Sequence, residues 1–289
     1  MTNVIEKFTK VMQIRNLSQG TQSRYLDAIE KLARCYPNQK LEDLSEDQVQ
    51  DYLLGRVSNN LSQSTLRQEG AAFRLLFNTT LKKNPQSFLI PVTKKKKKLP
   101  YILSRGEVSK MFRVIAYDLR KTAYFSILYG CGLRGAEACN LRMCDIDSEN
   151  RTVWVRDGKG GKDRGVFLPE SVYISLANYW KASRFEDYIF VGRKNSSGPM
   201  HIKVAQNWLG SMKRETGIAK PGGLHLFRHS YATHALEDGV HLLTIKKHLG
   251  HSSLRTTLIY LELAQISNPE KTSIDRMFES MAPSNPPVW

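Results

Sequence analysis

Apolar residues in the first 83 positions recur at the three- and four-residue spacing of amphipathic helices. We expect four helices here. The first lies near residues 4–14, and a serine that can cap a helix N-terminus precedes each of the other three: Ser18, Ser45 and Ser62. Gln48 follows Ser45 at the spacing of a capping box, and Pro37 ends the second helix because proline cannot continue one. The pattern predicts a small all-helical domain over residues 1–83.

A segment without helical or strand periodicity follows at residues 84–100. Its three prolines discourage regular structure, and the five consecutive lysines at 94–98 repel one another and extend the backbone. The segment is predicted to be a linker. Its lysines suit two purposes equally, either as a solvated connector or as a strap across a phosphate backbone.

The second predicted domain, residues 101–289, mixes helical patterns with a little strand. The strand-like stretches 151–155 and 165–169 flank a glycine-rich basic loop and predict a β-hairpin; a further strand-like piece lies at 187–191. Helical patterns surround them, at residues 104–116, 119–131, 134–141, 170–183, 202–217, 224–238, 241–249 and 253–263. The tail, 264–289, offers one short amphipathic helix near 270–281. The predicted fold class is mainly α with a small antiparallel β-sheet, in two domains.

Composition narrows the functional classes. The chain has no apolar run close to the roughly 20 residues that span a bilayer, and its N-terminus lacks the apolar core of a secretory signal. We therefore expect a cytoplasmic protein without a membrane partner. The spacing of the four cysteines matches no common zinc site, so reduced thiols and no bound metal are expected: Cys35, Cys131, Cys139 and Cys144.

Charge points to nucleic acid. The chain has 43 Lys and Arg against 27 Asp and Glu, a formal net charge of +16. Most of that excess lies after residue 90. An uneven positive charge of this size is typical of proteins that bind a phosphate backbone, although acidic membranes or acidic proteins also attract it.

Four separated motifs carry side chains whose chemistry fits together. They are GLRGAEACNL with Arg134, GKGGKDRGVFLP with Lys159, HLFRHSYATHAL with His225 and Arg228, and LGHSSLRTTLIY with His251 and Tyr260. Arginine forks hold phosphate oxygens, a tyrosine hydroxyl can act as a nucleophile, and lysine can protonate a leaving oxygen. On the predicted helix at 224–238, His225 and Arg228 share a face, whereas His229 and His234 are expected to point elsewhere.

In this order and with these separations, the motifs resemble those of the tyrosine recombinases, the phage-integrase and Xer-like family. The helical N-terminal unit is similar to the family's core-binding domain in size and position. Two small departures are Gly135, where a branched apolar residue is common, and Phe227, where leucine is usual. Neither position supplies a reacting group.

The resemblance implies specific roles. Arg134 and Arg228 would grip the scissile phosphate, Lys159 would be the general acid for the 5′-hydroxyl, and Tyr260 would form the 3′-phosphotyrosyl link. His225 would contact the phosphate and handle protons, and His251 would bond the phosphate. Glu137 would support the first arginine.

The resemblance further implies a homotetramer on double-stranded DNA with paired inverted sites, and no cofactor. We expect DNA contacts from basic residues in both domains and the linker: Arg24, Arg67, Lys94, Lys95, Lys96, Lys97, Lys98, Lys162 and Arg164. The leading functional hypothesis is integration or excision of a mobile element. The alternatives are Xer-type dimer resolution, a type IB topoisomerase, and a DNA-binding protein without catalysis.

Overall fold

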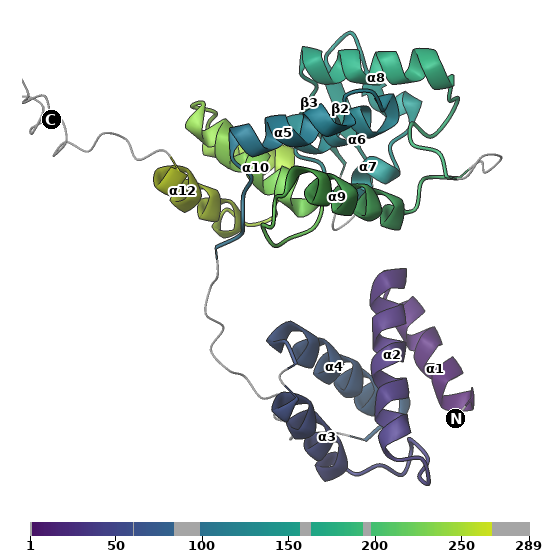
Figure 1. The fold of residues 1–289 in the computed structure, drawn as a ribbon. Helices are drawn as coiled ribbons and strands as arrows, with labels where there is room; N and C mark the ends of the chain where they lie inside the picture. The colour runs from purple at the N-terminus through teal and green to yellow at the C-terminus, as the bar shows by residue number, and fades with distance from the viewer. Residues whose placement is uncertain (1, 60, 84–98, 157–162, 193–197, 268–289) are drawn as a thin grey trace, which may run out of the picture. The chain divides into compact units, whose positions relative to one another are not determined.

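The computed structural model describes residues 2–59, 61–83, 99–156, 163–192 and 198–267 (Figure 1). The chain divides into two compact units, residues 1–97 and 98–289. Each unit has its own hydrophobic core, so the two are described separately. The expected tail helix near 270–281 and the tip of the hairpin lie outside the described residues.

The N-terminal unit is helical throughout its regular elements. It consists of α1 (Thr2–Ile14), α2 (Gln19–Cys35), α3 (Glu46–Ser58), α4 (Gln63–Leu75) and a π-helical turn at Leu76–Thr80. The serines expected to begin helices do so, since the hydroxyls of Ser18, Ser45 and Ser62 accept hydrogen bonds from main-chain N–H groups of the first turns. The capping box of Ser45 and Gln48 is complete.

The core of this unit is made by one apolar face from each helix. Phe8 of α1, Leu32 of α2, Leu53 of α3 and Phe73 of α4 are all inaccessible to solvent. The ring of Phe73 meets that of Tyr52 edge-on, with centroids 5.7 Å apart. The helical periodicity read from the sequence therefore corresponds to a real shared core.

The second unit surrounds a small sheet with helices. Its elements are α5 (Arg105–Ile115), α6 (Leu119–Gly130), α7 (Gly135–Cys139), a 3-10 turn (Met143–Asp145), β1 (Ile146–Asp147), β2 (Thr152–Val155), β3 (Arg164–Phe167), α8 (Glu170–Ser183), α9 (Ile202–Thr216), α10 (His225–Glu237), α11 (Leu242–Leu249) and α12 (Arg255–Ser267). The strands form one antiparallel sheet in the order β1-β2-β3. The predicted fold class, mainly α with a small antiparallel sheet in two domains, is confirmed.

The strand predicted at 187–191 is wrong. The segment forms only isolated bridges, from Tyr188 to Arg142 and from Val191 to Pro199. Its apolar character has another cause, because Ile189 and Phe190 are buried in the main core. The third strand of the sheet is instead the two-residue β1, which is too short to produce a periodic signal.

Helix α6 is the centre of the second unit and packs against α5, α7, α8 and α10 (Figure 1). Tyr124 and Phe125 of α6 are fully buried, and the Tyr124 hydroxyl donates to the carbonyl oxygen of Gly135 over 3.0 Å. This bond fixes the start of α7 against α6. A second cluster, in which Ala232, Ile245, Leu249, Tyr260 and Leu263 pack together, joins α10, α11 and α12.

The turn after α6 depends on a glycine. Gly132 has φ +63°, and a Cβ there would lie 2.4 Å from the ring of Tyr231 on α10. Only glycine meets both conditions. The turn therefore brings the residues that follow it, Arg134 included, directly beside α10.

Candidate active site

Tyr260 lies on α12, and its apolar body belongs to the cluster that joins α10, α11 and α12. Only 2% of the residue is exposed. Its hydroxyl oxygen is 2.9 Å from Nδ1 of His229. Burial raises the pKa of Tyr260, while the positive charges of Arg228 and Arg134 act in the opposite direction. The hydroxyl is therefore protonated at neutral pH and lies in the field of two guanidinium groups.

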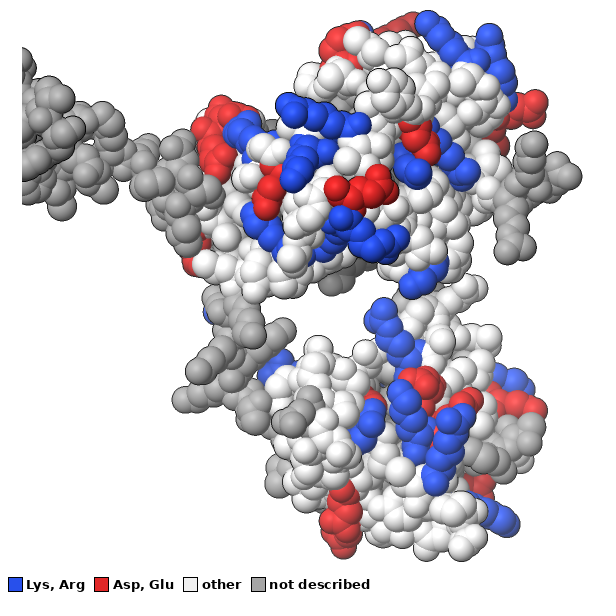
Figure 2. All heavy atoms as spheres, viewed as in Figure 1, with Lys and Arg blue, Asp and Glu red and all other residues white. Residues whose placement is uncertain are grey.

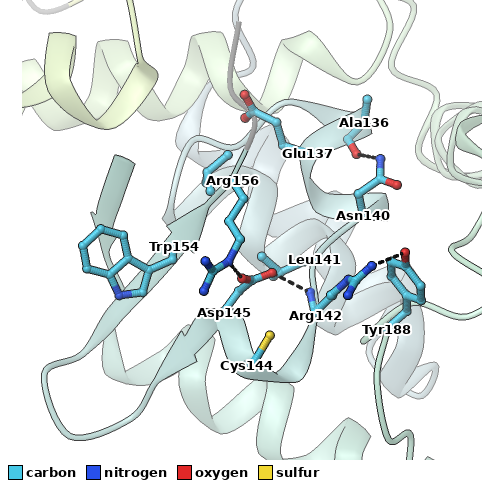
Figure 3. A pocket seen from close by; sticks show the side chains of 11 residues that line it. Ala136, Glu137, Asn140, Leu141, Arg142, Cys144, Asp145, Trp154, Arg156 and Tyr188 are labelled. Atoms are coloured by element: carbon cyan, nitrogen blue, oxygen red, sulfur yellow. Dashed lines mark hydrogen bonds and ion pairs between the residues drawn. The ribbon is translucent and has the colours of Figure 1, made fainter. Parts of the chain in front are cut away.

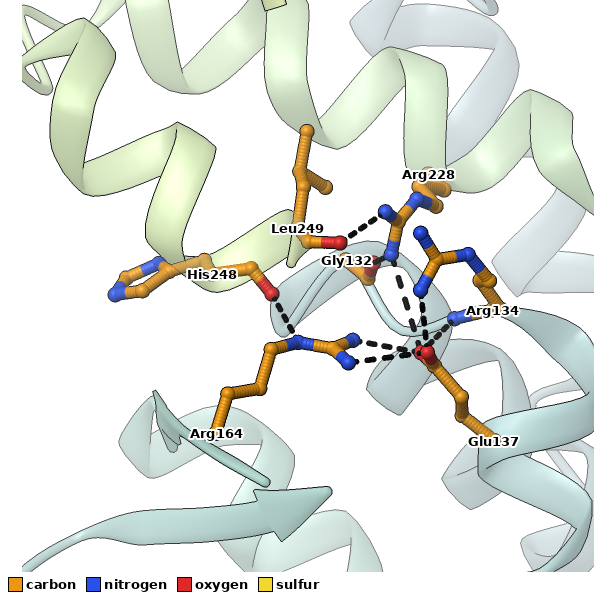
Figure 4. Close-up of polar contacts among 7 residues, drawn as sticks. All are labelled: Gly132, Arg134, Glu137, Arg164, Arg228, His248 and Leu249. Atoms are coloured by element: carbon orange, nitrogen blue, oxygen red, sulfur yellow. Dashed lines mark hydrogen bonds and ion pairs between the residues drawn. The ribbon is translucent and has the colours of Figure 1, made fainter. Parts of the chain in front are cut away.

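Three arginines converge on one carboxylate, that of Glu137 on α7 (Figure 4). Arg134 donates to it from Nη1 at 2.6 Å and from its main-chain N–H at 2.8 Å. Arg164 of β3 donates through both terminal nitrogens, at 3.0 and 2.7 Å, and Nη1 of Arg228 lies 3.9 Å away. Burial alone would raise the pKa of Glu137, but the hydrogen bonds from Arg164 and Arg134 lower it to about 2.

Arg228, on α10, is held by main-chain oxygens. Its side chain donates to the carbonyl of Gly132 over 2.7 Å and to the carbonyl of Leu249, the last residue of α11. Burial, helped by the nearby charge of Arg134, lowers the pKa of Arg228 to about 10. Three guanidinium groups and one carboxylate leave a local excess of positive charge. Such an excess favours an anion such as a phosphodiester.

Besides His229, two further histidines, His225 and His251, belong to the cluster around Tyr260. Burial and the charges of Arg228 and Arg134 lower the pKa of His225, at the start of α10. The same causes lower the pKa of His251 to about 4. The ring of His251 stacks on that of Tyr260 with centroids 6.2 Å apart, and its Nδ1 is 3.0 Å from the Thr257 hydroxyl. These imidazoles are therefore neutral at pH 7 while no anion is bound.

The structure brings together six of the residues singled out in the sequence: Arg134, Glu137, His225, Arg228, His251 and Tyr260. They come from α7 and the residue before it, from α10, from the α11–α12 connection and from α12. Lys159 and Lys162, with the linker lysines 94–98, lie outside the described residues. Arg24 on α2 and Arg67 on α4 are exposed, as a DNA contact needs.

Arg164 is not placed as expected for a DNA contact. Its side chain is 8% exposed and engages Glu137 with two nitrogens, while Nε donates to the carbonyl of His248 over 2.8 Å. All three of its guanidinium nitrogens have partners within the unit, which indicates that Arg164 holds these segments together and is not a DNA contact. Arg164 instead ties β3 to α7 and to the end of α11.

His229 is the site residue that the sequence reading missed. It was expected to point away from the site, yet it contacts the Tyr260 hydroxyl, and its ring centre lies 5.9 Å from that of His225. Burial, with His225 and Arg228 nearby, lowers the pKa of His229 to about 4. The spacing of His225 and His229, four residues apart on one helix, was the available signal, because such residues share a face.

A pocket of about 800 Å³ opens beside the arginine cluster, and Glu137 contributes to its wall (Figure 3). The side chains of Arg142 and Arg156 line this pocket. Arg142 bonds to the Tyr188 hydroxyl at 2.9 Å and lies over that ring, and Arg156 pairs with the buried Asp145 at 2.6 Å. On the molecular face seen in Figure 2, Lys and Arg side chains gather in groups on both units.

Among the described residues, no helix has both the length and the apolar character that spanning a bilayer requires. The described residues also contain no cluster of three or more His, Cys, Asp or Glu side chains arranged to hold a metal ion.

The chain is similar to known proteins along its whole length. The phage integrase family matches residues 102–266, and the N-terminal SAM-like domain of phage integrases matches residues 4–86. An integrase/recombinase of Sinorhizobium fredii is 32% identical, covering 100% of this chain and 93% of that protein. The tyrosine recombinase XerC of Bacillus subtilis is 27% identical, covering 91% and 92%.

Among solved structures, the site-specific recombinase XerH bound to a palindromic difH substrate has the same fold, with a TM-score of 0.68. It is 24% identical, covering 91% of this chain and 82% of that one. The family match spans more than half of the chain and includes the whole cluster around Tyr260. The chain therefore belongs to the phage integrase family, and it is a tyrosine-type site-specific recombinase.

Proposed function

We propose that Tyr260 is the nucleophile that cuts DNA, and that the chain integrates or excises a mobile element. The observation that carries the first part is the position of the Tyr260 hydroxyl within the field of Arg134 and Arg228. A phosphodiester held by the two guanidinium groups would meet the hydroxyl oxygen. The arginines would also neutralise the charge that develops as the phosphorus accepts a fifth oxygen.

In the proposed reaction, the Tyr260 oxygen forms a bond to phosphorus and the bond to the 5′-oxygen breaks. The products are a 3′-phosphotyrosyl link and a free 5′-hydroxyl, whose proton comes from Lys159 as general acid. His225 and His251, neutral before DNA binds, hydrogen-bond the phosphate. The covalent link keeps the energy of the broken bond, so rejoining to a new 5′-hydroxyl needs no ATP.

Glu137 supports this site without reacting. It fixes Arg134 through both the side chain and the main chain. Its low pKa keeps the carboxylate ionised throughout the neutral range. We propose that Glu137 thereby orients Arg134 for the phosphate, because a guanidinium group that is already held in place loses little conformational freedom when the phosphate binds.

DNA binding is assigned to basic side chains outside the reacting cluster. Arg24 and Arg67 would contact the backbone from the N-terminal unit, and Lys162 from the hairpin. The linker lysines, 94–98, would run along the backbone as a strap. Arg142 and Arg156 join this set because the structure orients both at the pocket beside Glu137. We propose paired inverted DNA sites and a homotetramer, by analogy with the palindromic substrate of XerH.

The biological role rests on the relatives. The Sinorhizobium fredii integrase/recombinase matches the full chain at 32% identity, whereas the Bacillus subtilis XerC matches at 27%. Integration or excision is therefore preferred, and Xer-type resolution of chromosome or plasmid dimers is the alternative. A type IB topoisomerase is disfavoured because the N-terminal unit matches the SAM-like domain of phage integrases.

The nucleophile is tested with Tyr260→Phe. The variant should still bind duplex DNA that carries the target site but should form no adduct that survives denaturation, whereas the unaltered chain forms one. An adduct formed by Tyr260→Phe would remove Tyr260 as the nucleophile. The role is tested by sequencing the joints that the protein makes between DNA flanking its gene and an unrelated target. Joints confined to two identical sites would favour dimer resolution.

A further inference from the structure

The Tyr260 hydroxyl has a hydrogen-bond partner that the assigned roles do not use. Within the described residues, that partner is His229, whose Nδ1 lies 2.9 Å from the hydroxyl oxygen. The two ring centres are 5.7 Å apart. His251 stacks on the tyrosine ring, but its Nδ1 bonds to Thr257. The nucleophile thus already touches one imidazole before DNA binds.

The charged groups around His229 determine whether its imidazole can accept a proton. The groups around it are His225 and Arg228 on α10, Tyr260 on α12, and His251 before α12. With burial, the two α10 neighbours lower the pKa of His229 to about 4. A neutral imidazole can accept the hydroxyl's hydrogen bond at Nδ1. A bound phosphodiester would offset the positive charges and make the ring more basic.

We propose that His229 is the general base that takes the proton of Tyr260 during DNA cleavage. The inference rests on Tyr260 being the nucleophile. As the tyrosine oxygen bonds to phosphorus, its O–H bond breaks and the proton moves to Nδ1 of His229. The bond from phosphorus to the 5′-oxygen breaks, and that oxygen takes a proton from the acid assigned to Lys159. In rejoining, His229 returns its proton to the tyrosine oxygen as the phosphotyrosyl bond breaks.

This assignment divides the work of two histidines on one helix. His225 and His229 lie one turn apart, with ring centres 5.9 Å from each other. His229 contacts the reacting oxygen, whereas His225 lies among Arg134, Arg228 and Glu137, the groups that shift its pKa. His225 therefore remains with the phosphate, and the proton of the nucleophile goes to His229.

A histidine–tyrosine hydrogen bond can also be purely structural, and the same unit provides the comparison. Nδ1 of His234 lies 2.8 Å from the Tyr129 hydroxyl, and His234 is on α10 with His229. His234→Asn therefore makes the same replacement at a bond of the same type, 2.8 Å against 2.9 Å, outside the site. Asparagine is the informative replacement because its oxygen can accept the hydrogen bond but does not take up a proton.

The test uses the full chain and a nicked duplex that traps the covalent adduct, in single-turnover reactions. His229→Asn should slow adduct formation about 100-fold or more, the size typical of a lost general base. His234→Asn should stay within roughly threefold of the unaltered chain. A His229→Asn rate within that same range would overturn the proposal. Tyr260→Phe runs alongside, and any adduct from it would remove the nucleophile itself, which is a separate failure.

A substrate with sulfur in place of the leaving 5′-oxygen separates base from acid. Sulfur leaves without a proton, so it should restore Lys159→Ala but leave His229→Asn slow. Full restoration of His229→Asn by sulfur would place His229 on the leaving-group side and overturn the proposal.

The rate profile with pH keeps the proposal testable if His229→Asn does not fold. The unaltered sequence is prepared with a fluorinated tyrosine at position 260, which lowers the pKa of the phenol. If His229 takes the proton, the acid limb of the profile follows the imidazole and stays in place. If the acid limb of the rate profile instead shifts to lower pH together with the pKa of the phenol, the tyrosine loses its proton to solvent, and the proposal is overturned.

Discussion

Arg164 Nη2 lies 2.7 Å from Glu137 Oε2 and holds the carboxylate on which Arg134 and Arg228 also converge. Arg164 opens β3, the second strand of the hairpin whose loop carries Lys159. Its Nε bonds to the carbonyl of His248 near the end of α11. One buried side chain therefore connects the hairpin, the Glu137 cluster and the segment before His251.

Replacing Arg164 should destabilise the protein strongly. Arg164→Met leaves Glu137 buried with fewer donors, and removing one partner of a buried ion pair costs about 3–5 kcal/mol of unfolding free energy. Asp187→Asn weakens the pair with Arg142, in which the two side chains are 57% and 48% exposed, and should cost less than about 1 kcal/mol. Denaturant unfolding of both variants measures the difference. Equal losses would show that Arg164 does not hold the cluster.

Acid should weaken the protein in two steps. His229 and His251 have folded pKa values of about 4, below the ordinary value near 6.5. Between these values the unfolded chain binds more protons than the folded one, so stability is present above about pH 6.5 and falls as pH drops toward 4, by up to about 3 kcal/mol per histidine. Glu137, with a folded pKa of about 2, adds a further loss below about pH 4.5.

Denaturant titrations at several pH values measure this slope. His251→Asn should flatten the part between pH 6.5 and 4, and Glu137→Gln should flatten the part below it, relative to its own stability at pH 7. An unchanged slope in His251→Asn would mean that this histidine is protonated in the folded protein.

Gly132→Ala should damage the turn that holds Arg228. The new Cβ would lie 2.4 Å from the Tyr231 ring, at φ +63°. Gly239→Ala is the control, because Gly239 has φ +82° but no atom within 4 Å of the added Cβ. Gly239→Ala should cost about 1 kcal/mol from backbone strain alone, and Gly132→Ala about 1–3 kcal/mol more from overpacking. Thermal unfolding compares them, and equal shifts would mean that Tyr231 simply moves aside.

Lys159→Ala should slow DNA cleavage by about 100-fold or more if Lys159 is the general acid. The leaving 5′-oxygen then departs without a proton. A substrate with sulfur at that position should restore the rate of adduct formation, measured on the same nicked duplex. Failure of sulfur to restore it would remove Lys159 as the acid. Lys162→Ala, which removes a proposed DNA contact from the same loop, should weaken DNA binding and should not be restored by sulfur.

Local chemistry made much of the fold predictable. The serine caps at 18, 45 and 62 each begin a helix in the structure, because a cap is a contact within one turn. The hairpin was also predictable, because a glycine-rich loop lies between two strand-like stretches. The structure of the segment 187–191 was not predictable, because its apolar residues pack into the core and do not pair as a strand.

The site residues that lie in sequence motifs were predictable, whereas contacts between segments far apart in the sequence were not. Arg164 looked like one more cation in the basic run of the hairpin, but its partners lie 27 and 84 positions away in the sequence. No periodicity reports such a contact. The spacing along α10 places His229 one turn after His225, but its partner Tyr260 comes from α12, 31 positions away in the sequence.

The carbonyls of Gly132 and Leu249 hold Arg228. Main-chain oxygens are present whatever amino acid occupies a position, so this grip is insensitive to the identity of the side chain at 249 as long as the end of α11 keeps its path. An apolar replacement of Leu249 that keeps α11 packed therefore leaves the arginine held. Position 249 is restricted by the packing of a fully buried side chain and not by the bond to Arg228, whereas Gly132 has no room for a side chain at all.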